Sequence, residues 1–275
     1  MSKVYEIVTE QVLAALDRGT VPWSRPWNLC GGQQNLDGRS YRGINPLLLE
    51  IASHLNGFDK PYWATFKQAQ KYGGQVRKGS KSTLITFWKS YLKEDENGDE
   101  QKRFMLRYFK VFNVAQIDGL KWEEPVTVAV DHDPIAAGES LIASMPNAPL
   151  ITVKATDTAC YIPALDAVML PELGQYPKAE DYYRIAFHEL AHSTGHEKRL
   201  ARNLKFHGEE YAAEELVAEL SAAMLCAVTR IASDVEQSAA YIAGWRKALT
   251  ADPKMIISAA SKAQKAADCI RGVEQ

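Results

Sequence analysis

Residues 185–196 read Ile185-Ala186-Phe187-His188-Glu189-Leu190-Ala191-His192-Ser193-Thr194-Gly195-His196. On a helix, His188 and His192 lie one turn apart on the same face, so both imidazoles can bind a single Zn²⁺ ion. Glu189 then stands where it can take a proton from a water molecule on that ion. Metal-assisted amide hydrolysis requires this set of groups, and the stretch therefore predicts a zincin-type metal site with Glu189 as general base.

The third protein ligand is not fixed by this stretch. The flanking apolar residues predict a largely buried helix, in which two histidines without a ligand role would carry an unpaired polar cost. In the metzincin pattern a third His follows ten residues after the first, but that position is Lys198, which cannot serve. His196 lies two residues too early for the same pattern. The ligand is therefore expected on another helix.

Residues 209–226 read EEYAAEELVAELSAAMLC and predict that next helix. Its apolar residues can pack against the first helix, and Glu215 and Glu219 then lie one turn apart on one face. We predict Glu215 as the third ligand and Glu219 as the carboxylate that accepts a hydrogen bond from a ligand imidazole. Glu219 and Glu214 remain alternatives for the ligand itself.

Two features near the motif have an open role. The extended stretch 161–171 has the form of an edge strand that could hold a peptide by strand addition, and a simple core strand is an equal alternative. Tyr182 or Tyr183 could donate a hydrogen bond in a transition state, although aromatic packing is the favoured interpretation.

Charge divides the chain more clearly than its total of −2 suggests. Residues 1–122 carry 18 Lys and Arg against 12 Asp and Glu, a net charge of +6. Residues 123–275 carry 14 against 22, a net charge of −8. Because a polyanionic partner is attracted to the basic part, we expect nucleic acid to bind the first half.

Five of the six tryptophans lie in this basic first half, interleaved with cations. Aromatic faces that stack bases beside cations that follow phosphates suit single-stranded DNA, whereas tryptophans are equally needed by a small core. The predicted DNA-binding residues are Trp23, Arg25, Trp27, Arg39, Tyr41, Arg42, Lys67, Lys71, Arg77, Lys78 and Lys81.

Periodicity and turn residues predict an α+β protein of two domains, with a boundary where Gly and Pro recur between residues 119 and 150. A mixed α/β domain is expected over residues 1–125, and a mainly helical domain with a small sheet over residues 126–275. The expected elements of the first are helices at 4–16, from Asn45 and after Thr65, and a hairpin of strands 83–92 and 103–114. Those of the second are strands at 150–155 and 159–163, an extended segment at 166–170, and helices at 134–144, from about 178, and at 209–228, 233–248 and 253–270.

Long stretches in both halves resemble one family, the ArdC-type antirestriction proteins of conjugative plasmids. They are VPWSRPW (21–27), GRSYRGIN (38–45), YWATFKQAQKYGGQVRKGSKS (62–82), YYRIAFHELAHSTGHEKRL (182–200) and EELVAEL (214–220). The resemblance implies a single-stranded DNA-binding domain joined to a metallopeptidase-like domain, which together shield incoming DNA from host restriction.

Two functions of different class follow from these observations. In the first, the N-terminal domain coats the entering strand and the metal domain is secondary. In the second, an active metallopeptidase is brought to DNA and cleaves a host protein bound there, such as a restriction-related one. The ligand set favours Zn²⁺, with Mn²⁺ as an alternative. Because no run of about 18 apolar residues and no signal peptide occurs, we expect no membrane partner and a cytoplasmic location.

Overall fold

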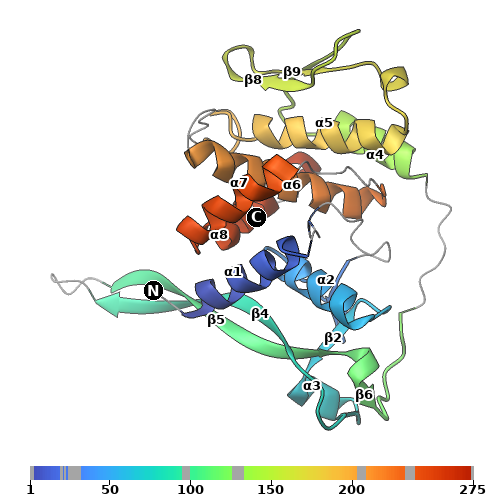
Figure 1. Cartoon of the computed structure of the whole chain (residues 1–275), viewed down its shortest axis with the longest axis vertical. Coiled ribbons are helices and arrows are strands. Elements are labelled where there is room, and N and C mark those ends of the chain that lie inside the picture. Colours follow the sequence, from blue (N-terminus) through green and yellow to red (C-terminus); the bar gives the residue numbers. More distant parts are fainter. Residues whose placement is uncertain are drawn as a thin grey trace.

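The computed structural model of the chain describes residues 3–18, 21, 23, 32–94, 100–125, 133–202, 209–232 and 239–273 (Figure 1). The first half holds helices α1 (Lys3–Leu16), α2 (Asn45–Asn56) and α3 (Phe66–Lys71), and strands β1 (Gln34–Asn35), β2 (Tyr62–Thr65), β3 (Gln75–Val76), β4 (Thr83–Glu94), β5 (Glu100–Asn113) and β6 (Ile117–Asp118). The second half holds helices α4 (Pro134–Ala143), α5 (Ala179–Ser193), α6 (Glu209–Thr229), α7 (Ala239–Ala251) and α8 (Met255–Arg271), and strands β7 (Leu150–Val153), β8 (Cys160–Ile162) and β9 (Ala167–Leu170). The predicted α+β class is confirmed.

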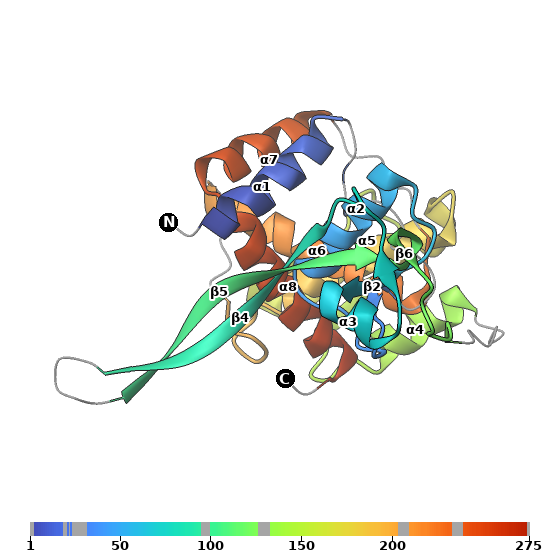
Figure 2. The same cartoon turned by 90° about the horizontal axis from the view of Figure 1, so that it is seen from below.

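The first half is built on a four-stranded sheet in the order β1-β2-β5-β4. Strands β4 and β5 pair antiparallel from Thr83↔Val111 to Glu94↔Glu100, which confirms the predicted hairpin and lengthens both strands. The two strands form a twisted ribbon that runs outward past α1 (Figures 1 and 2). The base of this β4–β5 ribbon contributes Leu84 and Leu106 to the core, while its outer part is solvated.

Helix α3 begins as its sequence predicts. The Thr65 side chain accepts a hydrogen bond from the Gln68 backbone N–H, and the Gln68 side chain accepts one from the Thr65 N–H. This reciprocal pair satisfies two N–H groups that the first helical turn leaves without partners. Gly73, at a φ of 73°, follows the end of the helix in a conformation that glycine adopts without steric cost.

In the second half, the extended stretch 161–171 belongs to two strands, which lie where a strand at 159–163 and an extended segment at 166–170 were expected. Pro163 opens a short 3₁₀ turn, and Asp166 at a φ of 45° reverses the chain, so that β8 pairs antiparallel with β9. The sheet order is β7-β9-β8, which makes β8 the edge strand and β9 the central one. Both strands pack against α5.

The two halves of the chain share one hydrophobic core. Helix α1 lies against α7 and α8, and its Val8 and Val12 belong to the same cluster of buried side chains as Leu220 and Ile256 (Figure 1). The Thr9 hydroxyl also donates a hydrogen bond of 2.8 Å to the Pro253 carbonyl. The N-terminal helix therefore depends on the C-terminal half for the burial of its apolar face. In the described ranges, no helix has the length and apolar character needed to cross a bilayer.

Candidate functional site

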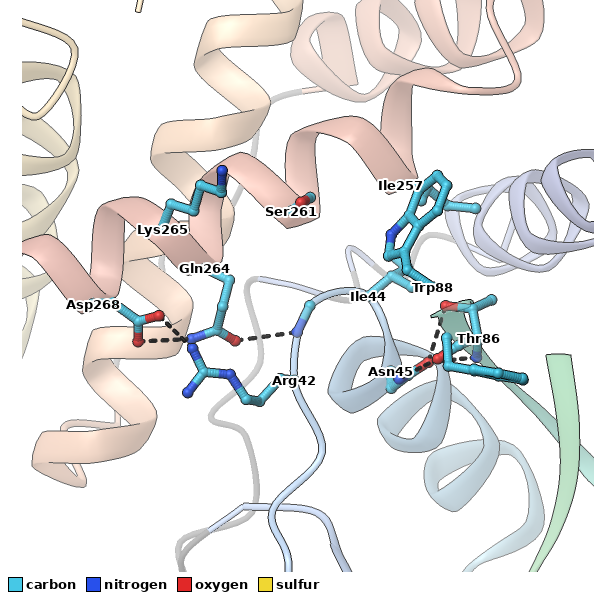
Figure 3. Close-up of a pocket in the computed structure, with 12 residues that line it drawn as sticks. Arg42, Ile44, Asn45, Thr86, Trp88, Ile257, Ser261, Gln264, Lys265 and Asp268 are labelled. Atoms are coloured by element: carbon cyan, nitrogen blue, oxygen red, sulfur yellow. Dashed lines mark hydrogen bonds and ion pairs between the residues drawn. The ribbon is translucent and has the colours of Figure 1, made fainter. Parts of the chain in front are cut away.

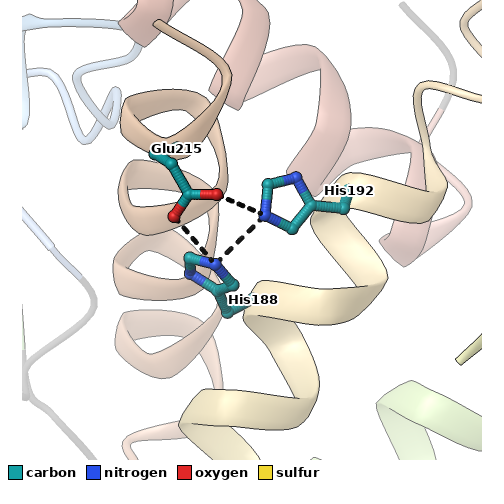
Figure 4. Close-up of side chains that lie close together, drawn as sticks. All are labelled: His188, His192 and Glu215. Atoms are coloured by element: carbon teal, nitrogen blue, oxygen red, sulfur yellow. Dashed lines mark hydrogen bonds and ion pairs between the residues drawn. The ribbon is translucent and has the colours of Figure 1, made fainter. Parts of the chain in front are cut away.

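Two packed helices bring three potential metal ligands together. Helix α5 presents His188 and His192 one turn apart, and α6 presents Glu215 opposite them (Figure 4). The Nε2 atoms of the two histidines are 3.1 Å apart, and the Glu215 oxygens lie 3.6 Å from Nε2 of His188 and 3.3 Å from Nε2 of His192. One atom from each residue lies within 4.8 Å of the others. Two imidazoles and a carboxylate are the donor set of a catalytic zinc site with an open position.

A second carboxylate, on Glu219, orients the first histidine. Its Oε1 lies 3.5 Å from Nδ1 of His188, while its Oε2 accepts a 2.7 Å hydrogen bond from Arg184. Because Nδ1 faces a carboxylate, the Nε2 atom is left to face the ligand cluster. The role predicted for Glu219, as the acceptor of a hydrogen bond from a ligand imidazole, stays a prediction.

The same arrangement surrounds the second histidine. Oε1 of Glu214 lies 3.5 Å from Nδ1 of His192, and Arg202 donates a 2.7 Å hydrogen bond to the same carboxylate oxygen. The three glutamates that competed for the ligand position thus occupy three different places. Glu215 faces the shared cluster, and Glu214 and Glu219 each stand behind one imidazole.

This acidic environment changes the protonation of His192. Burial alone would lower the pKa of its imidazole, but the hydrogen bonds to Glu214 and Glu215 raise the pKa to about 9. The pKa of Glu215 is lowered, because hydrogen bonding to His192 and the charges of both histidines outweigh the effect of its burial. In the absence of a cation, the cluster therefore holds a proton where a divalent ion would carry the positive charge.

The predicted general base lies beside the edge strand. Oε2 of Glu189 accepts a 2.8 Å hydrogen bond from the backbone N–H of Tyr161 in β8. The other carboxylate oxygen makes no hydrogen bond within the described part of the chain and can accept a proton from a water molecule. The position of β8 is fixed in turn by Asp166, which accepts hydrogen bonds from the Tyr161 hydroxyl and from Arg199.

Other groups near the motif take no part in the cluster. Tyr183 is buried and donates its hydroxyl proton to Glu139, and Tyr182 packs edge-on against it with ring centroids 5.1 Å apart. Both are packing residues, as favoured from the sequence. His196 and Lys198 lie 3.9 and 3.6 Å from Asp166, outside the ligand cluster.

Sequence reasoning missed the two arginines. Arg184 precedes His188 by four residues, so helical spacing alone places it on the same face, and this signal was available. Arg202 follows α5 in irregular backbone and reaches Glu214 only through the tertiary fold. No local pattern identifies it.

The predicted DNA-binding residues divide into three groups. Trp23 does not fit its predicted role: it is 0% exposed and packs edge-on against Trp245, with ring centroids 5.1 Å apart. A side chain buried in the core cannot stack on a base. Tyr41 is half-buried against the cluster of Leu49 and Trp63, and burial raises the pKa of its hydroxyl. Arg25 and Trp27 lie outside the described residues.

The remaining predicted cations are exposed. Arg42 forms an ion pair with Asp268 of α8, Lys71 lies 3.2 Å from Asp37, and Arg77 donates to the Ala115 carbonyl and lies 3.8 Å from Asp118. The side chains of four exposed cations make no ion pair or hydrogen bond with another described residue: Arg39, Lys67, Lys78 and Lys81.

The β4–β5 ribbon carries a surface of another kind, which the sequence prediction did not single out. Its large exposed side chains are Trp88, Tyr91, Leu92, Phe104, Met105, Tyr108 and Phe109. Lys89, Lys102, Arg103, Arg107 and Lys110 alternate with them. Residues 83–93 and 101–113 of the ribbon include no acidic residue. The alternation is visible in the sequence, where it predicts a hairpin but does not show that these side chains are exposed.

Two family models match separate parts of the chain. A family model described as a zincin-like metallopeptidase matches residues 139–262, and the model of the N-terminal domain of anti-restriction factor ArdC matches residues 2–112. The fold and the site thus define a protein with a zincin-like metallopeptidase domain behind an ArdC-type N-terminal domain.

Relatives that align over the whole chain narrow this class. The metal-free crystal structure of the antirestriction protein ArdC from plasmid R388 has a TM-score of 0.81 and 35% identity, covering 98% of this chain and 99% of that one. Its Mn(II)-bound structure has a TM-score of 0.79 and 34% identity, with 98% and 97% coverage. An uncharacterized protein of Sinorhizobium fredii is 35% identical over 96% of this chain and 90% of its own length. The chain belongs to the ArdC family of antirestriction proteins.

A longer relative contains the same sequence pattern. The DNA primase TraC of Escherichia coli is 38% identical over 98% of this chain, but the chain spans only 27% of the primase. The zincin-like domain and the Mn(II)-bound relative support metal binding by the candidate centre.

Proposed function

We propose that this protein binds single-stranded DNA through its β4–β5 ribbon and thereby protects incoming conjugative DNA from host restriction. The proposal rests on the exposed aromatic and cationic side chains that alternate along the ribbon with no acidic residue among them. Base stacking on aromatic rings contributes about 1–3 kcal/mol per base, and cations along the same surface follow the phosphates. This function requires the protein to act in the cytoplasm, where restriction enzymes meet the entering strand.

Trp88 and Phe104 are the residues that test it. Both side chains project from the same face of the ribbon. Trp88 and Ser90 are two residues apart in β4 and therefore share a face, and Ser90 lies directly opposite Phe104 in β5. Phe66 of α3 is a matched control, since it is an aromatic residue of the same exposure, 50% against 49% for Trp88, outside the ribbon.

The Trp88→Ala/Phe104→Ala variant is expected to lose about 1–3 kcal/mol per stacked base, measured by fluorescence anisotropy with a labelled oligo(dT). Affinity of the wild type should also fall steeply as salt rises. Phe66→Ala should bind as the wild type does. Full affinity in the double variant, or binding that does not depend on salt, would refute the proposal.

The second candidate function is a metallopeptidase that cleaves a host protein bound to the same DNA. The orientation of Glu189 beside the edge strand β8 favours it, because an extended peptide added to that edge would lie next to the carboxylate. His188, His192 and Glu215 would hold the metal, for which we propose Zn²⁺, with Mn²⁺ as the alternative for this donor set. A bound divalent ion supplies polarisation of a carbonyl group and a lowered pKa for water.

The chain's own residues supply the remaining steps. The free oxygen of Glu189 takes the proton of the attacking water and can return it to the leaving amine. Glu219 and Glu214 fix the two imidazoles, and β8 offers backbone N–H and C=O groups that align the substrate.

Glu189→Gln separates the two functions. It keeps the three metal ligands and removes the base, so protection of transferred DNA by strand binding should be unchanged. The measurement is conjugation efficiency into restricting and non-restricting recipients, with Zn²⁺ content and oligo(dT) affinity measured on the same variant. Loss of protection with metal and DNA binding intact would establish the peptidase instead.

A further inference from the structure

Two cavities lie along the line where the two halves of the chain meet. The first, of about 390 Å³, is lined by Arg42 and Trp88 from the first half and by Ser261, Gln264 and Lys265 of α8 (Figure 3). The second, of about 480 Å³, is lined by Ser40, Tyr41 and Arg42 from the first half and by Met224, Arg230 and Arg271 from the second. Arg42 and Gln264 line both cavities, so the two cavities adjoin each other, and we call them together the seam.

The seam is basic, although the C-terminal half as a whole is acidic. Its lining contains four cations, Arg42, Arg230, Lys265 and Arg271, and its one carboxylate among the described lining residues is that of Asp268. The Asp268 side chain is 2% exposed; Arg42 and Gln264 donate to its two oxygens, and Arg271 lies 4.0 Å away. More positive than negative charge therefore faces the seam, so a polyanion is favoured there.

The seam continues from the ribbon. Trp88 lies directly opposite Leu106 in the ribbon and also lines the first cavity, where its side chain is half exposed. Phe104 and Lys102 extend the same face of the ribbon away from the cavity. A cavity of 390 Å³ falls within the range of about 300–1,000 Å³ that small-molecule sites occupy, so it can accept one base with its sugar.

We propose that a DNA single strand bound along the ribbon continues into the seam, so that the C-terminal half completes the DNA site. A base stacks on Trp88 at the mouth of the first cavity, where Lys265 of α8 contacts a phosphate, and a phosphate further along the strand contacts Arg230 in the second cavity. This inference rests on the proposed single-stranded DNA binding and adds that the acidic half contributes cations to it.

The test compares two pairs of cations in the full-length chain. Arg230→Ala/Lys265→Ala removes two seam cations, and Lys247→Ala/Lys262→Ala removes two lysines of α7 and α8 that line neither cavity. Binding of labelled oligo(dT) is measured from 50 to 200 mM salt, and the slope of log affinity against log salt is compared. A single-strand phosphate contact contributes about 0.7 to this slope, so the seam variant should lose about 1.4 and the control nothing.

Lys265→Ala alone provides a variant that preserves the fold, because its side chain is exposed, and it should lose about 0.7 of the slope. An unchanged slope in Lys265→Ala and in the seam pair would overturn the inference. If those variants bind as the wild type does while Trp88→Ala/Phe104→Ala binds weakly, the ribbon function stands and only the seam is wrong. A wild type that does not bind oligo(dT) would refute the proposed function itself.

Discussion

Glu219→Gln tests whether the carboxylate behind His188 tunes the metal centre. Gln keeps the size of the side chain but removes the charge that lies 3.5 Å from Nδ1 of His188. Loss of such a partner typically lowers metal affinity by about 10–100-fold, which corresponds to about 1.4–2.7 kcal/mol. The assay is competition for Zn²⁺ against a chromophoric chelator at constant pH, with the exposed carboxylate variant Glu123→Gln as the control.

The same substitution also leaves Arg184 without its ion-pair partner. The Arg184 side chain is only 6% exposed, and an uncompensated buried charge costs about 3–5 kcal/mol of folding free energy. Urea unfolding in excess chelator measures this cost separately from metal binding. The double variant Arg184→Met/Glu219→Gln removes the orphan charge, so it should recover stability but not metal affinity. A folded Glu219→Gln protein with wild-type Zn²⁺ affinity would refute the reasoning.

Three further predictions concern stability. Trp23→Ala should lower the free energy of unfolding by about 3–5 kcal/mol in urea, because it empties a core position, while the folded protein keeps its oligo(dT) affinity. Wild-type stability together with weakened oligo(dT) binding would instead support a stacking role for Trp23. In metal-free protein, the raised pKa of His192 stabilises the fold fully below its unfolded pKa of about 6.5, and this contribution is lost as pH rises through about 9. Urea unfolding at pH 6.5 and 9.5 measures the loss, with His192→Gln as the control. An equal pH dependence in the wild type and in His192→Gln would contradict the prediction. Thr65→Ala should cost about 1 kcal/mol through loss of the α3 N-cap, and an unchanged urea midpoint would show that the cap contributes nothing.

Local periodicity determines how much of the site could be predicted. His188, Glu189 and His192 form one motif, and helix geometry alone places the two imidazoles together. Glu215 and Glu219 share a helix face, so spacing offers both to the histidines but leaves open which of them is the ligand. The place of Glu214 cannot be predicted from spacing either, because which ring nitrogen it meets depends on how α5 and α6 cross. The helices and the long hairpin were predicted for the same reason, since each follows from a pattern in one continuous stretch of the sequence.

The DNA-binding residues were harder to predict because burial is a long-range property. Trp23 lies in a segment rich in Pro and cations, which favours an exposed site, yet its packing partner Trp245 follows more than 200 residues later in the chain. Conversely, Trp88 and Phe104 lie in predicted strands, but whether a strand face is covered depends on elements far away in the chain, and these side chains are 49% and 61% exposed. Arg42 was chosen for its charge, and its ion pair with α8 places it between the halves of the chain.

Helix α6 connects the two sites that these experiments address. It carries Glu214, Glu215 and Glu219 toward the metal ligands, and its last turns, with Met224 and Val228, line the seam. Glu215 and Arg230 are 15 residues apart, which corresponds to about 22 Å along a helix. The ligand cluster and the seam thus lie at different parts of the same helix. A protein bound to a DNA strand in the seam could reach the metal centre, so DNA binding and peptide cleavage are compatible on one molecule, and Glu189→Gln is the variant that separates them.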